Sequence, residues 1–303
     1  MKATKLRHLF EEKALIRTVG AHDGLTAKLV EINKFDGIWA SGLEISASHM
    51  VPDASILTMT DFLEAAIEMN EATSIPIIAD CDTGFGNLNN VARMVSKYES
   101  NGIAAVCIEE KKHPKINSLY CSDKDSIVPI HDFVAKLIAA RKARKTKDFM
   151  IFARIEALVL GLESEEAIKR AKAYAQAGAD GIFVHAKAQQ QIVNFVKEWD
   201  GEAPLIICPT LYPSFTEKEI RRLKKIKMVI YANHILRTAI MAINSTLNEI
   251  YHNGIVKIDK KITSLSEVFE LQGMNAMVKN EKKILKLTKK QWSLLHKKKN
   301  INE

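Results

Sequence analysis

The sequence predicts a (β/α)₈ barrel, and three observations lead to this fold class. Eight short runs rich in apolar and β-branched residues alternate with longer segments whose apolar residues recur every three or four positions. This alternation is typical of parallel strands joined by helices. The runs are almost wholly apolar, as expected for strands covered on both faces. Eight such units in about 250 residues match the usual size of a closed barrel.

The expected strands leave room for one helix between each neighbouring pair. They are 15–20, 37–41, 76–80, 104–109, 149–156, 181–185, 204–209 and 228–232. Helical periodicity is clearest over 88–100, 130–144, 163–177 and 235–251. In the runs NGIAAVCIE, AGADGIFVH and FDGIWASG we expect a Gly to end the helix before the strand. An open doubly wound sheet is the alternative, but it usually has fewer strands, and no GxGxxG follows the first strand.

No Pro-, Gly- or Ser-rich linker divides the 303 residues, so we expect one barrel domain with added helices over 1–275 and a lysine-rich tail over 276–303. Nine lysines and two glutamates follow residue 278, which accounts for +7 of the net charge of +8. The basic character therefore belongs to the tail and says little about the barrel. We interpret the tail as a solvated or frayed helix. Its interleaved apolar residues leave open that it forms a packing helix or binds an acidic surface.

The composition gives no sign of a membrane or secreted protein. No stretch approaches the roughly 18 apolar residues of a membrane span. The first residues are mixed in charge and lack an apolar signal core. The four cysteines lie far apart without a CxxC pair, so neither a zinc site nor a disulfide framework is expected. We expect a cytoplasmic protein with no nucleic-acid or membrane partner.

Polar side chains follow most of the expected strands at the point where each strand ends. The residues are Ser41, Asp80, Asp82, Glu109, Arg154, Glu156, His185, Thr210 and Asn233. In a barrel these ends meet at one rim, where active sites are built. Any one of them could be a helix cap or a solvated loop residue. Their joint placement predicts an active site at this rim.

Three carboxylates form the most informative group on the rim. Asp80 and Asp82 point the same way if their strand persists, and Glu109 comes from the next strand. Carboxylates that converge in apolar surroundings repel one another unless a cation lies among them. Hard oxygen ligands suit Mg²⁺. The alternative for Asp82 is that it only caps the following turn.

A basic residue, a histidine and a loop complete the candidate site. Arg154 lies inside an apolar strand, so it must be paired. Its partner is either a carboxylate such as Glu156 or the carboxylate or phosphoryl oxygens of a substrate. His185 is either a hydrogen-bonded rim histidine or a substrate contact. Residues 115–119 form a polar loop that is either solvated or a lid over the carboxylates.

At these residues the chain resembles the phosphoenolpyruvate mutase/isocitrate lyase superfamily, over roughly residues 5–275. The matching stretches are GIWASGLEISAS (37–48), IIADCDTGFGNLNN (77–90), CIEEKKHPKINSLY (107–120), FARIEALVLG (152–161) and YANHILR (231–237). The D-x-D-T-G-x-G-N run is common to the superfamily. The SGL-x-x-S and PK-x-NSL runs are narrower and resemble those of mutases and phosphonopyruvate hydrolases.

The resemblance implies a role for each matching residue. Asp80 would ligate Mg²⁺ directly, with Asp82 and Glu109 acting mainly through water. The implied catalytic residues are Asp53, Lys115, Asn117, Ser118, Arg154 and His185. Trp39, Ser41, Gly42 and Leu43 would frame a substrate pocket whose backbone N–H groups hold an enolate oxygen. In this scheme Asp53 approaches the migrating phosphoryl group, and the loop that carries Lys115 closes over the substrate.

The implied reaction interconverts phosphoenolpyruvate and 3-phosphonopyruvate, which forms the C–P bond in phosphonate biosynthesis. The resemblance also implies a last helix exchanged between subunits and a homotetramer built as a dimer of dimers. Phosphonopyruvate hydrolase, with the same fold and metal, is the first alternative. A 2-methylisocitrate-type C–C lyase is less favoured, because its K-[KR]-C-G-H loop is replaced by KKHPK at 111–115. The cluster of Asp80, Asp82 and Glu109 argues against a non-enzymatic barrel that binds ligands or RNA through its tail.

Two details bear on the choice between mutase and hydrolase. The mutase pattern carries Asn in the lid where the hydrolase has Thr, and this chain has Asn117. Ala186 and Leu211 stand where close mutase relatives are expected to carry Ser and Lys. Both lie near the rim, so we expect them to influence substrate fit.

Overall fold

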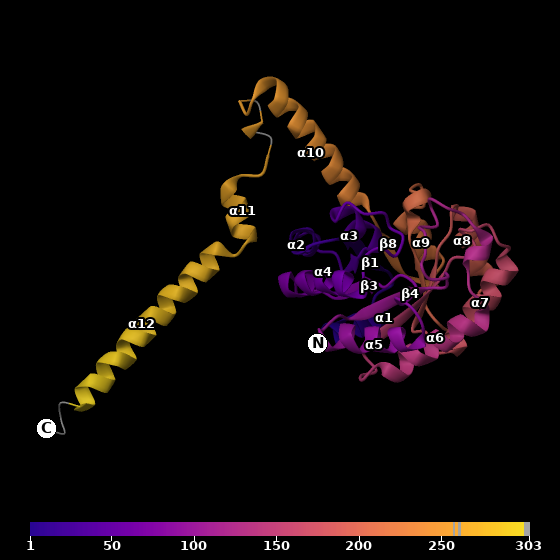
Figure 1. The fold of residues 1–303 in the computed structure, drawn as a ribbon, viewed down its shortest axis with the longest axis horizontal. Helices are drawn as coiled ribbons and strands as arrows, with labels where there is room; N and C mark the ends of the chain where they lie inside the picture. The colour runs from indigo at the N-terminus through magenta and orange to yellow at the C-terminus, as the bar shows by residue number, and fades with distance from the viewer. Residues whose placement is uncertain (257, 260–261, 300–303) are drawn as a thin grey trace. The chain divides into compact units, whose positions relative to one another are not determined.

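Eight parallel strands close into one barrel in chain order, with β8 pairing back onto β1 (Figure 1). The computed structural model describes residues 1–256, 258–259 and 262–299. The strands are β1 Ile16–Ala21, β2 Gly37–Ala40, β3 Ile77–Asp80, β4 Ala105–Glu109, β5 Met150–Ile155, β6 Gly181–Val184, β7 Leu205–Ile207 and β8 Ile226–Tyr231. The predicted fold class is confirmed, and each expected strand boundary lies within two residues of the observed one.

The helices are α1 Lys2–Glu12, α2 Gly24–Ile32, α3 Gly42–Ser48, α4 Met59–Ala72, α5 Leu88–Ser100, α6 Ile130–Ala143, α7 Ser164–Gln176, α8 Gln189–Glu198, α9 Glu217–Arg222, α10 His234–Asn253, α11 Leu265–Leu271 and α12 Met274–Lys299. Those that lie between β1 and β8 in the chain pack on the outside of the barrel. Short 3₁₀ turns lie at Lys124–Ser126 and Pro209–Leu211. Side-chain caps fix several starts. Thr58 and Asn87, for example, accept hydrogen bonds from the first-turn N–H groups of α4 and α5.

Two of the three predicted helix-ending glycines are confirmed. Gly102 and Gly178 have φ of 78° and 97°, the left-handed conformation that ends α5 and α7. The expectation for FDGIWASG is wrong, because the left-handed residue after α2 is Lys34, with φ of 62°. Gly37 instead begins β2, where a Cβ would lie 3.2 Å from Ile78 Cδ1. Close packing inside the barrel, rather than a turn, requires Gly there.

The barrel interior forms its own apolar layer, separate from the layer between strands and helices. Trp39, Phe152 and Phe183 belong to it, and Leu6 and Phe10 of α1 join them. The rings of Phe10 and Phe152 are 5.6 Å apart. Since α1 also bonds the backbone just before β5, it closes the N-terminal end of the barrel. The C-terminal end is left for the site.

The chain divides into two compact units, Met1–Ala239 and Ile240–Glu303. The first holds the barrel, and the second holds most of α10 together with α11 and α12. Side chains of α12 from 274 to 293 are exposed, among them Met274, Met277, Ile284 and Leu285. No helix of the described residues is both long enough and apolar enough to cross a bilayer.

The exposure of α12 makes the tail testable by truncation. Ending the chain after Val278 should leave the barrel folded and its turnover nearly unchanged, because the barrel core and the cavity residues lie within Met1–Ala239. Circular dichroism, size-exclusion chromatography and a turnover assay would check this. An insoluble product, or one that falls from an oligomer to a monomer, would show that the apolar side chains of α12 pack against another surface.

Candidate active site

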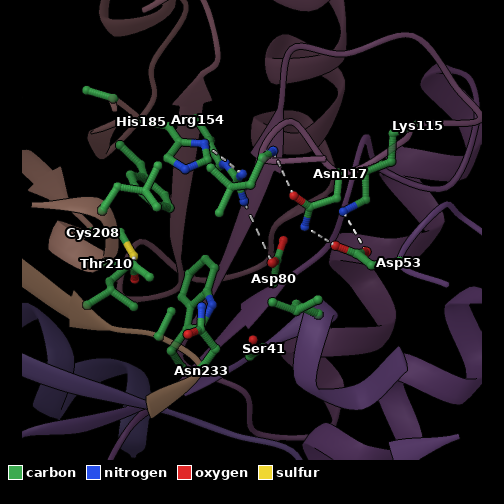
Figure 2. Close-up of a pocket in the computed structure, with 18 residues that line it drawn as sticks. Ser41, Asp53, Asp80, Lys115, Asn117, Arg154, His185, Cys208, Thr210 and Asn233 are labelled. Carbon is green, nitrogen blue, oxygen red and sulfur yellow. Dashed lines mark hydrogen bonds and ion pairs between the residues drawn. The ribbon is translucent and has the colours of Figure 1, made fainter. Parts of the chain in front are cut away.

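A cavity at the C-terminal ends of the strands collects most of the predicted residues. Nine of them line it: Trp39, Ser41, Leu43, Asp53, Asp80, Lys115, Asn117, Arg154 and His185 (Figure 2). Gly42, Asp82, Glu109 and Ser118 do not line it but lie close behind it, as the contacts below show. The long-range closure of the barrel thus brings together residues that lie up to 146 positions apart in the chain, from Trp39 to His185.

One side of the cavity is built around the buried ammonium group of Lys115. Its Nζ lies 2.8 Å from Asp53 Oδ1 and 3.0 Å from Asp82 Oδ1. Asn117 Nδ2 donates to Asp53 Oδ2 at 2.6 Å. The carboxylates raise the pKa of Lys115 well above its usual range although burial opposes this, and Lys115 in turn lowers the pKa of Asp53 against its burial. The loop after β4 therefore lines the cavity and is tied to Asp53 and Asp82 there.

Two residues that sequence reasoning did not single out hold this loop. Lys111 is 2% exposed and donates to Ser118 Oγ at 3.1 Å and to the Ile116 carbonyl. Ser55 Oγ accepts the backbone N–H of Lys115 at 3.1 Å and donates to Asp82 Oδ2 at 3.3 Å. In sequence, Lys111 looks like one of several solvated lysines. Only its burial reveals that it stabilises the loop.

Arg154 and His185 form the opposite side, and Arg154 is paired with the carboxylate that the sequence suggested, Glu156. Its guanidinium bonds Glu156 and His185 Nδ1, the latter at 3.0 Å, and its Cζ lies 5.2 Å from the Phe183 ring. Arg154 and His185 hold the pKa of Glu156 well below its usual range against the effect of burial. Burial lowers the pKa of His185. A guanidinium and an imidazole whose charged form is disfavoured by burial thus face the cavity.

The three carboxylates predicted as metal ligands are buried but differ in their surroundings. Arg154 Nη1 lies 3.8 Å from Asp80 Oδ2 and 3.4 Å from Glu109 Oε2. Asp82 lies beyond the end of β3 in a left-handed conformation, with φ of 47°, so the strand does not persist to it. Its carboxylate binds Lys115 and Ser55 instead of capping the turn. The turn-cap alternative is therefore wrong.

These carboxylates fit a cation that is held partly through water. Burial raises the pKa of Asp82 to about 6 and that of Glu109 to about 8, although Lys115 opposes both shifts. Glu109 Oε1 is buried and finds no hydrogen-bond partner in the described ranges of the chain. Among the described residues, no three His, Cys, Asp or Glu side chains converge closely enough to hold a metal by themselves. A cation at this place would therefore need water or substrate oxygens among its ligands.

The segment after β2 brings backbone donors beside Asp80. Ser41 caps α3, so the N–H groups of Gly42 and Leu43 lie in its first turn and have no intrahelical acceptor. A Cβ on Gly42 would lie 3.2 Å from Asp80 Oδ2. Only Gly allows this close approach without a shift. The segment can therefore present N–H donors to an anionic oxygen next to the carboxylates.

The remaining wall of the cavity is mainly apolar. It includes Phe183, Ala186, Cys208, Leu211, Ile230 and Ala232. Ala186 and Leu211, where the sequence departs from the expected pattern, thus do line the cavity. Thr210 and Asn233 add polar groups to this wall. Phe183, Cys208 and Ile230 were missed because a strand residue that faces the cavity has the same apolar character as one in the core.

The family model described as phosphoenolpyruvate phosphomutase matches residues 6–251, which is most of the chain. The chain belongs to this family. The match spans all eight strands and every predicted site residue.

Relatives in the family differ in the reaction named for them. The chain is 43% identical to a phosphonopyruvate hydrolase of Variovorax sp. over 94% of this chain and 99% of the relative. A crystal structure of a phosphoenolpyruvate phosphomutase from Streptomyces platensis is 44% identical, with a TM-score of 0.92 over 94% of this chain and all of that one. A phosphonopyruvate hydrolase structure in complex with oxalate and Mg²⁺ is 42% identical, with a TM-score of 0.89 over 94% and 99%. Identity alone does not separate the two reactions.

Proposed function

We propose that this protein is a phosphoenolpyruvate mutase, an isomerase that interconverts phosphoenolpyruvate and 3-phosphonopyruvate. The observation that carries the proposal is the 2.6 Å hydrogen bond from Asn117 to Asp53, which ties the loop across the cavity. In the mutase pattern this position is Asn, whereas in the hydrolase it is Thr. The lid therefore has the side chain expected for the enzyme that keeps water out.

The reaction transfers a phosphoryl group within one molecule. The bond from phosphorus to the enol oxygen breaks, the bond from phosphorus to C3 forms, and the enolate becomes a ketone. The transferring group is loosely bonded in the transition state, so positioning and charge supply most of the catalysis. Arg154 and Lys115 contribute positive charge at the cavity, and Asn117 restrains the phosphoryl group. The N–H groups of Gly42 and Leu43 are placed to stabilise the enolate oxygen.

We propose Mg²⁺ as the cofactor, held directly by Asp80 and through water by Asp82 and Glu109. When bound, it would stabilise the negative charge of the enolate. Support comes from the buried carboxylates and from the similar hydrolase structure with oxalate and Mg²⁺. We further propose a cytoplasmic location. The homotetramer and the role in phosphonate biosynthesis that we also propose are implied by the resemblance.

A closed lid decides between isomerisation and hydrolysis. Water that reaches the phosphoryl group before the enolate turns would yield phosphate and pyruvate. Asp53 and Asn117 form one bonded unit with Lys115, whose side chain is only 3% exposed.

A C–C lyase is disfavoured, because 111–115 holds no cysteine and the next one, Cys121, lies further along the loop.

Phosphorus NMR on the purified protein tests the assignment directly. With Mg²⁺ and phosphonopyruvate, the ³¹P spectrum should show phosphoenolpyruvate as the main product and little inorganic phosphate. The same sample with excess chelator should show no conversion. Phosphate as the dominant product would replace the mutase assignment with the hydrolase one. An unchanged phosphonopyruvate signal would rule out both.

A further inference from the structure

Asn233 has an unsatisfied side chain in the wall of the cavity. It follows β8, is 7% exposed and lines the cavity beside Ala232 and Thr210. Its amide oxygen is buried and has no hydrogen-bond partner among the residues that the structure describes. No hydrogen bond of its amide nitrogen lies within the described part of the chain, although that nitrogen is not among the fully buried unpaired atoms. Buried amides are nearly always hydrogen-bonded, so this one points to a ligand.

The backbone of Asn233 is held in place by a buried network. Its φ is 53°, a left-handed conformation that Asn tolerates better than most residues. Its N–H donates to Glu44 Oε1 at 2.8 Å, and the other oxygen of this fully buried carboxylate lies 3.3 Å from His22 Nδ1. A Cβ at Gly20 would lie 2.0 Å from Glu44 Oε1, so only Gly leaves room for the carboxylate. Such over-determined strain is typical of a functional position.

The network also links Asn233 to the segment that carries the enolate donors. Glu44 belongs to α3, and its own N–H donates to Ser41 Oγ at 3.4 Å. Figure 2 shows Asn233 and Ser41 in the same part of the cavity, with Lys115 and His185 in other parts of it. Asn233 therefore lies with the groups assigned to the pyruvate portion of the substrate. Asp53 and Asn117 serve the phosphoryl group.

We propose that Asn233 is a further substrate-binding residue whose amide N–H donates to an oxygen of the pyruvate portion. The identity of that substrate rests on the proposed function. Since neither amide atom has a partner, a flip that exchanges them breaks no hydrogen bond, so the donor can face the ligand. The ligand class is a small 2-oxo acid or its enolate. Binding would give the unsatisfied amide its missing partner.

Oxalate is the probe for this site, because it has the shape and charge of a pyruvate enolate without the phosphoryl group. Its affinity would be measured by titration calorimetry with Mg²⁺ present. Asn233→Gly keeps the left-handed backbone but removes the amide. Asn233→Asp keeps the shape and replaces the donor with an anionic acceptor. Asn89→Asp, on the exposed face of α5, is the matched control.

The expected result is at least a roughly 10-fold loss of oxalate affinity in Asn233→Gly, the scale of one hydrogen bond to a charged group. Asn233→Asp should lose more through charge repulsion, and the control should bind normally. Binding of inorganic phosphate, which occupies the phosphoryl side, should be unchanged in Asn233→Gly. A purely structural role would instead weaken both probes together and lower the unfolding temperature.

Unchanged oxalate affinity in the folded Gly and Asp variants would overturn the proposal, as would equal losses for both probes or no oxalate binding by the unmodified protein. The outcome is separable from that for the mutase assignment. Oxalate binding that depends on Asn233, in a protein that releases phosphate or leaves phosphonopyruvate unchanged, would overturn only the mutase assignment. Isomerisation with oxalate binding that ignores Asn233 would overturn only the role of Asn233.

Discussion

Asp80→Ala should abolish turnover of phosphonopyruvate and remove the stabilisation that Mg²⁺ gives to the folded protein. Asp80 is the only one of the three carboxylates that lines the cavity, and Asp82 and Glu109 lie behind it. A cation present at about 100 times its Kd adds roughly 2.7 kcal/mol to the free energy of unfolding. Without its direct ligand the cation should no longer bind at that concentration. The unfolding temperature should then be the same with and without Mg²⁺.

The unfolding temperature would be measured with Mg²⁺ and after its removal by excess chelator. A ³¹P assay would measure turnover in the same samples. Asp200→Ala removes an exposed carboxylate that pairs with Lys172 outside the cavity, so it should keep both the metal response and the activity. A full Mg²⁺ response in Asp80→Ala would disprove the metal assignment. Lost activity with a retained metal response would instead place Asp80 in substrate binding.

Asn117→Ala should slow isomerisation by two or more orders of magnitude, a barrier increase of about 2.7 kcal/mol. The amide bonds Asp53 through Nδ2 and accepts the Leu119 N–H at 2.9 Å, so it both positions the phosphoryl group and orders the loop. Removing it opens a route for water. The fraction of product that appears as inorganic phosphate should therefore rise as the isomerisation rate falls.

Asn117→Thr offers a sharper comparison, because a shorter hydroxyl leaves space that water can fill. Asn117→Thr should release more phosphate than a loss of folding stability alone would explain. Product ratios and unfolding temperatures would therefore be measured together. Asn89→Ala, an exposed position on α5, is the control. An isomerisation rate in Asn117→Ala within about threefold of the unmodified protein would show that the lid amide does not act in the transition state.

Several features were predictable because they follow from local pattern. The strand runs and the amphipathic helices between them determine which elements form, and parallel strands place their C-terminal ends on one rim. Asp80, Glu109, Arg154 and His185 could be assigned to that rim for this reason. Gly102 and Gly178 could be assigned to helix ends, because the left-handed conformation favours Gly.

Other features depend on contacts between distant parts of the chain, which no local pattern encodes. The pairing of Lys115 with Asp53 and Asp82 joins three loops. It exists only in the closed barrel, so the sequence alone does not predict it. Gly37 was expected to end a helix and Gly20 to lie in a strand, yet at each position a Cβ would crowd an atom from another strand or helix. The link from Glu44 to Asn233 spans 189 positions. Sequence thus determined the elements and the rim. Tertiary packing decided which side chains are buried together and which polar groups are left for a ligand, because burial and pairing depend on the whole fold.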